Sequence, residues 1–322
     1  MADLRVLFAT KDIMKFMTEI NPALVDKRIT LNLKKWLVHG KSIKGALHSR
    51  TGYSNQDSIL WKQSDSSNTI IMSVADGHGS DIHFRSKVGS RIAVKTAVET
   101  LFELFHNQPI EINNVSQVKD IIRYSIPRLL VHNWMDRVQY HVEKHPFSNN
   151  EIDFILKKKG PHVLKKIINN PKIAYGSTLL TAVITKNYFI FFQLGDGNIL
   201  IVDNDKNIRN MFSNKTNDSE DKPSIESIIH TESLCMDDSW LEFKTGIFAF
   251  HALKPKLILL ATDGYCNSFR NASGFLKIGH DYLGILEDFG CSYLSQNLGN
   301  ILRQTSVDGS GDDITLGFIY HI

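Results

Sequence analysis

The chain has little cysteine and no long hydrophobic run. Its 322 residues include three cysteines, Cys235, Cys266 and Cys291, which are widely spaced and form no Cys-x-x-Cys pair. An odd number at these spacings argues against a disulfide framework and against a structural zinc site. No segment has the length and apolar character of a signal peptide or a membrane span. We therefore expect a cytoplasmic protein with reduced cysteines and no membrane contact.

Long runs of one charge are also missing. The formal net charge is +3, and the longest basic run, Lys157-Lys158-Lys159, is short. Without a basic stripe, nucleic acid is not an expected partner. The composition, 42% hydrophobic and 22% charged, is that of an ordinary soluble globular protein, which we expect to be a monomer. Ser177 lies in no Gly-x-Ser-x-Gly elbow and Cys266 has no adjacent histidine, so a nucleophilic hydrolase has little support.

What the chain does have is a set of aspartates at the ends of short apolar runs. They are Asp57 in Asn55-Gln56-Asp57, Asp76 in Ala75-Asp76-Gly77-His78-Gly79, Asp263 in Ala261-Thr262-Asp263-Gly264, and Asp312 in Gly311-Asp312-Asp313-Ile314-Thr315. A carboxylate at a strand end projects from a rigid sheet edge, and an adjacent glycine lets a ligand approach the backbone closely. Carboxylates, a backbone carbonyl and waters are the ligands that Mg²⁺ and Mn²⁺ prefer. The pattern predicts a hard-cation site, with enough acidic ligands for two ions.

Such a site suits hydrolysis of a phosphate ester. Two metals can share an oxygen, lower the pKa of a bridging water and neutralise the phosphoryl oxygens. His78, two residues after Asp76, could then protonate the leaving oxygen.

The remaining pattern predicts a mixed α and β fold. We expect an N-terminal extension over residues 1–43 with helices around Asp12 to Glu19 and Leu31 to Val38, then a β-hairpin that delivers Asp57 and Asp76. Helical spacing follows over 85–105 and 114–142, with a break at Pro127, and Ser148 with Glu151 has the spacing of a capping box. Strands are expected over 177–184, 188–194 and 198–202 as an antiparallel meander, and over 256–262 and 314–320, with helices between 282 and 303.

Five motifs in this order resemble those of the metal-dependent Ser/Thr protein phosphatases of type 2C, and Asn55-Gln56-Asp57 resembles the family's first acidic motif in a form similar to its bacterial branch. The five motifs are Ala75-Asp76-Gly77-His78-Gly79, Gly176-Ser177-Thr178, Leu194-Gly195-Asp196-Gly197, Ala261-Thr262-Asp263-Gly264 and Asp312-Asp313-Ile314-Thr315. The resemblance implies an α+β fold, an α/β sandwich of two packed antiparallel sheets flanked by helices. It places a phosphatase domain over 44–322, with a flap-like insertion at about 204–255.

The resemblance also implies roles for residues. Asp76 would bridge two Mn²⁺ or Mg²⁺ ions, Asp263 and Asp312 would complete one site, and Asp57 and the Gly77 carbonyl would serve the other. His78 falls at the general acid. Phosphoserine and phosphothreonine in protein substrates would be hydrolysed by direct attack of metal-bound water, without a phosphoenzyme.

The chain departs from the family's pattern at several positions. Gly52 stands where many members have a phosphate-binding arginine, so Arg50 and His48, nearby but off register, are the candidate phosphate contacts. Gln56 replaces a common glutamate, and Ile173 stands at the position of an acid associated with a third metal, which is therefore not expected. Two functions remain open: an active phosphatase, or a catalytically weak relative that binds phosphoproteins or regulatory partners.

Overall fold

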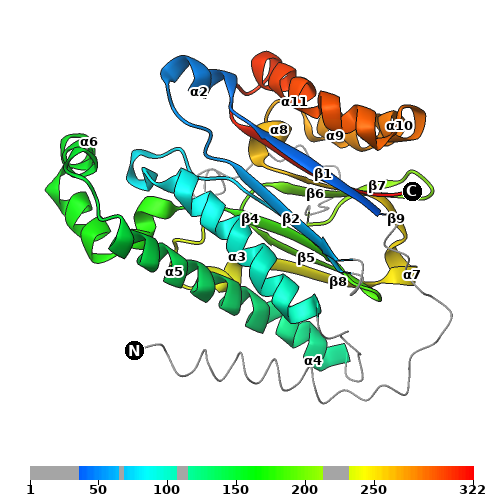
Figure 1. Cartoon of the computed structure of the whole chain (residues 1–322), viewed down its shortest axis with the longest axis horizontal. Coiled ribbons are helices and arrows are strands. Elements are labelled where there is room, and N and C mark those ends of the chain that lie inside the picture. Colours follow the sequence, from blue (N-terminus) through cyan, green and yellow to red (C-terminus); the bar gives the residue numbers. More distant parts are fainter. Residues whose placement is uncertain (1–35, 65–68, 107–114, 213–231) are drawn as a thin grey trace.

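The computed structural model describes residues 36–64, 69–106, 115–212 and 232–322. In these ranges two β-sheets pack face to face, and helices cover both outer sides (Figure 1). The expected α/β sandwich is confirmed.

Each sheet has five strands, and every neighbouring pair is antiparallel. The first sheet runs, in spatial order, β1 (Trp36–Ile43), β10 (Ile314–His321), β9 (Pro255–Ala261), β6 (Asn198–Asp203) and β7 (Ile208–Asn210). The second runs β2 (Ser58–Ser64), β3 (Thr69–Ala75), β4 (Leu179–Ile184), β5 (Tyr188–Leu194) and β8 (Lys244–Ala249).

Helices divide between the two outer faces. Beside the second sheet and its loops lie η3 (Asp81–His83), α3 (Ser86–His106), α4 (Val115–Asp120), the π-helical η4 (Ile121–Ser125), α5 (Ile126–Lys144), α6 (Asn149–Asn169), η5 (Pro171–Tyr175) and η7 (Ser239–Glu242). The remaining helices are α2 (Ala46–Thr51), α7 (Phe250–Leu253), α8 (Asp263–Cys266), α9 (Ala272–Leu276), α10 (Ile278–Asp288) and α11 (Gly290–Asp308), of which α10 and α11 cover the first sheet (Figure 1).

The core has three apolar layers because side chains alternate along each strand. On β3, Ile70, Met72 and Val74 face the other sheet, whereas Ile71 and Ala75 face the helices. With both faces covered, every residue of β3 is buried, which explains why the strand is almost uninterruptedly apolar.

Several local predictions are confirmed. The hairpin of β2 and β3 and the helix α3 lie where the sequence pattern placed them. The capping box before α6 is present: the Ser148 Oγ accepts from the Glu151 backbone N–H, and the Glu151 carboxylate accepts from the Ser148 N–H. Pro127 lies in the first turn of α5, directly after the π-helical segment η4 that interrupts the predicted helix.

The expected helix around Leu31 to Val38 is wrong at its C-terminal end. Residues Trp36–Ile43 form strand β1, which pairs along its whole length with β10. That partner lies far away in the sequence, so local apolar spacing carried no signal for it. The segment expected as an extension therefore contributes a strand to the first sheet, while residues 1–35, with the helix around Asp12 to Glu19, lie outside the described residues.

The expected three-stranded meander is also wrong. β4 pairs with β5, but β6 leaves for the other sheet and pairs with β9 and β7. Gly195 turns the chain at φ 99°, and the Gln193 side-chain amide donates to the carbonyls of Gly195 and Gly197, at 3.1 and 2.9 Å. A short glycine turn is compatible both with a hairpin and with a crossing between sheets, so the sequence could not separate the two.

The segment expected as an insertion contains two edge strands of the sandwich, β7 and β8. Its polar tract falls within 213–231, outside the described residues. Among the residues that the structure describes, no helix is both long enough and apolar enough to cross a membrane.

Candidate metal centre

The four predicted aspartates come from both sheets. Asp57 immediately precedes β2 and Asp76 immediately follows β3, and these two strand ends are neighbours because Ser58 pairs with Ala75. Asp263 begins α8 just after β9, and Asp312 lies just before β10, which pairs with β9. The sandwich thus carries one pair of carboxylates on each sheet.

Three of these carboxylates are in contact. The Asp76 carboxyl lies within hydrogen-bonding reach of both Asp57 and Asp263, and the charge of Asp312 acts on Asp76 and Asp263. Two carboxyl groups can share a hydrogen bond only when one holds a proton. Asp76 therefore occupies the middle of the cluster, between the Asp57 corner and the Asp263–Asp312 corner.

The cluster is electrostatically unfavourable without a cation. Burial raises the pKa of Asp57 to about 8, and the charge of Asp313 adds to this effect. Burial, with the charges of Asp57 and Asp263, raises the pKa of Asp76 well above its usual range, and burial also raises the pKa of Asp263. Packed carboxylates with oxygen atoms only are the donor set for a hard dication, so the residues present fit Mg²⁺ or Mn²⁺.

Three of the four carboxylates, those of Asp57, Asp263 and Asp312, accept a hydrogen bond from a neighbouring donor. The Thr262 hydroxyl donates to Asp57 Oδ2 at 2.7 Å, across the two sheets. The Asn267 amide donates to Asp263 Oδ2 at 2.9 Å, and the Asp313 backbone N–H donates to Asp312 Oδ1 at 2.8 Å. These bonds fix the orientation of the side chains before any ligand binds.

Asp313 ties together the segments that carry two of the aspartates. Its side chain is 3% exposed, Oδ1 accepts from the Gly45 N–H at 2.7 Å, and Oδ2 accepts from the Gln56 N–H at 2.7 Å. His48 Nδ1 lies 2.9 Å from the same Oδ2. Among the described residues, His48, Asp312 and Asp313 also bring one ligand atom each within 4.8 Å of one another.

Close backbone packing explains two of the glycines. A Cβ at Gly264 would lie 2.1 Å from the Asp313 carbonyl oxygen, so only glycine lets the Asp263 and Asp312 segments approach. A Cβ at Gly176 would lie 2.5 Å from His83 Nδ1 and 2.8 Å from His78 Cδ2. Gly176 therefore leaves the space in which the two imidazole rings pack.

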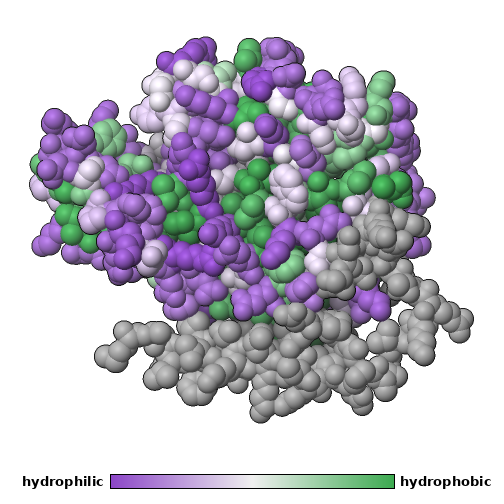
Figure 2. Space-filling view, in the orientation of Figure 1, coloured by the Kyte–Doolittle hydropathy of each residue, from purple (hydrophilic) through white to green (hydrophobic). Residues whose placement is uncertain are grey.

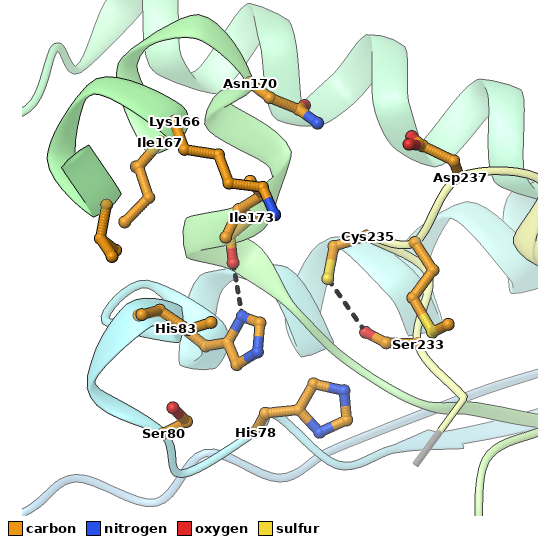
Figure 3. Close-up of a pocket in the computed structure, with 13 residues that line it drawn as sticks. His78, Ser80, His83, Lys166, Ile167, Asn170, Ile173, Ser233, Cys235 and Asp237 are labelled. Atoms are coloured by element: carbon orange, nitrogen blue, oxygen red, sulfur yellow. Dashed lines mark hydrogen bonds between the residues drawn. The ribbon is translucent and has the colours of Figure 1, made fainter. Parts of the chain in front are cut away.

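His78 lies on the loop that follows Asp76, two residues further along the chain. Its backbone N–H donates to the Gly176 carbonyl at 3.1 Å, and its ring centroid is 5.1 Å from that of His83. His83 Nδ1 bonds the Ile173 carbonyl (Figure 3). Burial, together with His83, lowers the pKa of His78 to about 4, so in the metal-free protein the ring is neutral at pH 7.

The two candidate phosphate contacts, His48 and Arg50, lie in different surroundings. His48 lies against Asp313, within the aspartate cluster, whereas Arg50 is exposed near the C-terminal end of α2. Gly52 caps that helix at φ 82°, with open space where a side chain would be. Gln56 donates instead to the Ser86 hydroxyl at 2.7 Å.

Sequence reasoning assigned no role to Asp313, Thr262 or His83. Asp313 and Thr262 lie inside the motifs, next to predicted ligands, and their neighbours gave the only signal for them. His83 has no motif of its own. Asp196, from the Leu194-Gly195-Asp196-Gly197 motif, lies close enough to raise the pKa of Asp263 through its charge.

Comparison with known proteins agrees with this geometry. The sequence model of the protein phosphatase 2C family matches residues 44–303. The chain belongs to the protein phosphatase 2C family. A comparison with curated protein sequences finds no match.

Solved structures with the same fold include serine/threonine phosphatases. The serine/threonine phosphatase of S. agalactiae has a TM-score of 0.53 at 16% identity, over 89% of this chain and 100% of that chain. Stp1 from Staphylococcus aureus has a TM-score of 0.52 at 14% identity, over 88% and 94%. The catalytic domain of PstP, in complex with two manganese ions, has a TM-score of 0.51 at 13% identity, over 88% and 97%. The type 2C resemblance is thereby confirmed for the family and the fold.

Proposed function

We propose that this protein hydrolyses phosphoserine and phosphothreonine in proteins and needs Mn²⁺ or Mg²⁺ to do so. The observation that carries the proposal is the contiguous contact of Asp57, Asp76 and Asp263, with His78 on the loop that bears Asp76. Family membership and the two manganese ions in the PstP structure support it.

The aspartates would divide the work of holding two ions. Asp76, in the middle, would contact both; Asp263 and Asp312 would hold one, and Asp57 with the Gly77 carbonyl the other. When bound, such ions supply Lewis acidity to the phosphoryl oxygens and lower the pKa of a water positioned for attack.

His78 would donate a proton to the leaving serine or threonine oxygen. Its pKa of about 4 leaves the metal-free ring neutral, but the negative charge of a bound phosphate favours the protonated form. Gly176 and His83 would orient the ring, because a Cβ at position 176 would displace it.

Turnover of an aryl phosphate and of a phosphoserine peptide, with and without added metal, tests the proposal. Activity should require Mn²⁺ or Mg²⁺ and disappear in excess chelator, since carboxylate sites hold such ions exchangeably. Full activity in chelator, or tightly bound zinc in the purified protein, would contradict the metal assignment.

One observation favours a second candidate function, a phosphoprotein-binding module with weak catalysis. Gly52 has open space where an arginine would hold the phosphate. Binding of phosphopeptides without metal-dependent turnover of either substrate would support this second function and exclude the first.

A further inference from the structure

A cleft opens beside the candidate metal centre. It has a volume of about 790 Å³ and lies between α6 with η5 on one side and the segment 233–237 on the other (Figure 3). His78 and His83 form part of its wall. The volume falls within the range of about 300–1,000 Å³ that is usual for ligand sites.

The cleft shares one residue, His78, with the proposed chemistry. His78, which lines it, follows the central Asp76 by two residues. An extended chain advances about 3.3–3.6 Å per residue, so two residues of a substrate would span about 7 Å. A peptide whose phosphate lies at the aspartates would thus bring its neighbouring residues to this cleft.

The interior of the cleft is mainly apolar. Ile82, Val163, Ile167, Ile173 and Met236 line it, from three separate segments of the chain. Ile167 is 1% exposed and Met236 is 37% exposed, so the lining runs from a closed floor to an open rim. An aliphatic side chain that entered the cleft would be removed from water on several sides, which favours binding.

The rim carries more positive than negative charge, because two lysines, Lys166 and Lys172, act on one carboxylate, Asp237. Lys166 lines the cleft, and Figure 3 shows its side chain extending over the opening. Asp237, the acidic residue of the lining, is bound by Lys172 at 2.8 Å, and the charges of Lys172 and Lys166 both lower the pKa of its carboxyl group. Within the described ranges, no carboxylate lies at ion-pair distance from Lys166. Lys157, Lys158 and Lys165 add exposed positive charge along α6, whose lobe is largely hydrophilic in Figure 2.

We propose that this cleft selects the substrate: it binds the residues beside the phosphoserine or phosphothreonine, taking one aliphatic side chain inside and an acidic residue at Lys166. The inference rests on the proposed phosphatase function and adds the class of sequence that the enzyme prefers.

Four phosphoserine peptides test the proposal. Each has either leucine or glycine, and either glutamate or lysine, within two residues of the phosphoserine. For the wild type, kcat/KM should be highest for the leucine and glutamate peptide, by about tenfold or more over the glycine and lysine peptide. The glutamate preference should weaken with salt while the leucine preference persists.

Variants connect the preference to the cleft. Lys166→Glu should reverse the charge preference, changing the glutamate-to-lysine ratio of kcat/KM by about fivefold or more. Lys165→Glu, the same charge change on the same helix but outside the cleft, should keep the wild-type ratio. Val163→Trp should reduce the leucine preference, with the melting temperature and aryl phosphate turnover reporting whether the fold is retained.

The outcomes separate the two proposals. Metal-dependent turnover of aryl phosphate with equal kcat/KM for all four peptides would overturn the cleft assignment and leave the phosphatase function standing. Equal effects of Lys166→Glu and Lys165→Glu would also overturn it. No metal-dependent turnover of any substrate would contradict the phosphatase function and the cleft assignment with it.

Discussion

Asp313 accepts the backbone N–H of Gln56 at 2.7 Å, and so joins the segment that carries Asp312 to the one that carries Asp57. The other oxygen of the same carboxylate accepts from Gly45. One buried side chain thus fixes the distance between two corners of the candidate metal centre.

Replacing Asp313 with alanine should damage both stability and metal affinity. It leaves the buried N–H of Gly45 and the partly buried N–H of Gln56 without an acceptor, which we expect to lower the free energy of unfolding by about 2–4 kcal/mol. Asp313→Asn keeps one acceptor oxygen, so its stability and metal affinity should lie between those of the wild type and of Asp313→Ala. Chemical denaturation and calorimetric Mn²⁺ titration check this, and wild-type metal affinity in a folded Asp313→Ala protein would contradict the positioning role.

The fold shows what local sequence can and cannot predict. β3 and α3 follow from apolar period and turn residues, because every residue of β3 is buried between two layers and α3 packs one face on it. The strand β1 could not be predicted from local sequence, because it forms by pairing with β10 at the far end of the chain. The crossing of the chain from one sheet to the other at Gly195–Gly197 could not be predicted either, since the sequence of the following strand is compatible with both sheets.

The site shows the same division. Asp57, Asp76, Asp263 and Asp312 stand out because each lies next to one end of an apolar run, and three of them, Asp57, Asp76 and Asp263, are in contact in the structure. His83 and the cleft beside α6 depend on how separate segments pack, which no local pattern encodes.

Gly176→Ala should impair catalysis without removing the metal ligands. The added Cβ would overlap the rings of His78 and His83, so the rings must shift. We expect kcat on a phosphoserine peptide to fall by about tenfold or more, on the scale of a misplaced general acid, with Mn²⁺ affinity nearly unchanged. Unaltered kcat, in a variant of normal stability, would show that the ring position is unimportant.

His78→Ala should discriminate between leaving groups. Serine is a poor leaving group and needs a proton, whereas an aryl oxide hardly does, so peptide turnover should fall by about 10²-fold or more and aryl phosphate turnover much less. The peptide rate of the wild type should decline as pH rises through the pKa of His78 in the substrate complex, and this limb should vanish in the variant. Equal losses on both substrates would remove the general-acid role.

Asp76→Asn should separate the effect of the carboxylate cluster on folding stability from its effect on metal binding and catalysis. The folded, metal-free protein raises the pKa of Asp76, so its ionised form is favoured in the unfolded chain. This penalty is absent below the unfolded pKa of about 3.9 and grows as pH rises, so in chelator the wild-type melting temperature should fall between about pH 5 and pH 8. The neutral asparagine should flatten this dependence, and a gain of about 1 kcal/mol would raise the melting temperature by about 2 °C in a domain of this size.

With Mn²⁺ present, the wild type should have a higher melting temperature than Asp76→Asn. The wild type should gain stability from bound metal and turn over phosphate, whereas Asp76→Asn should lose the charge that holds two dications together and fall in kcat by about 10³-fold or more. Asp205→Asn, an exposed aspartate in the turn after β6, is the matched control and should behave as wild type. A folded Asp76→Asn protein that binds two metal ions normally and still hydrolyses phosphate would show that this cluster is not the active site.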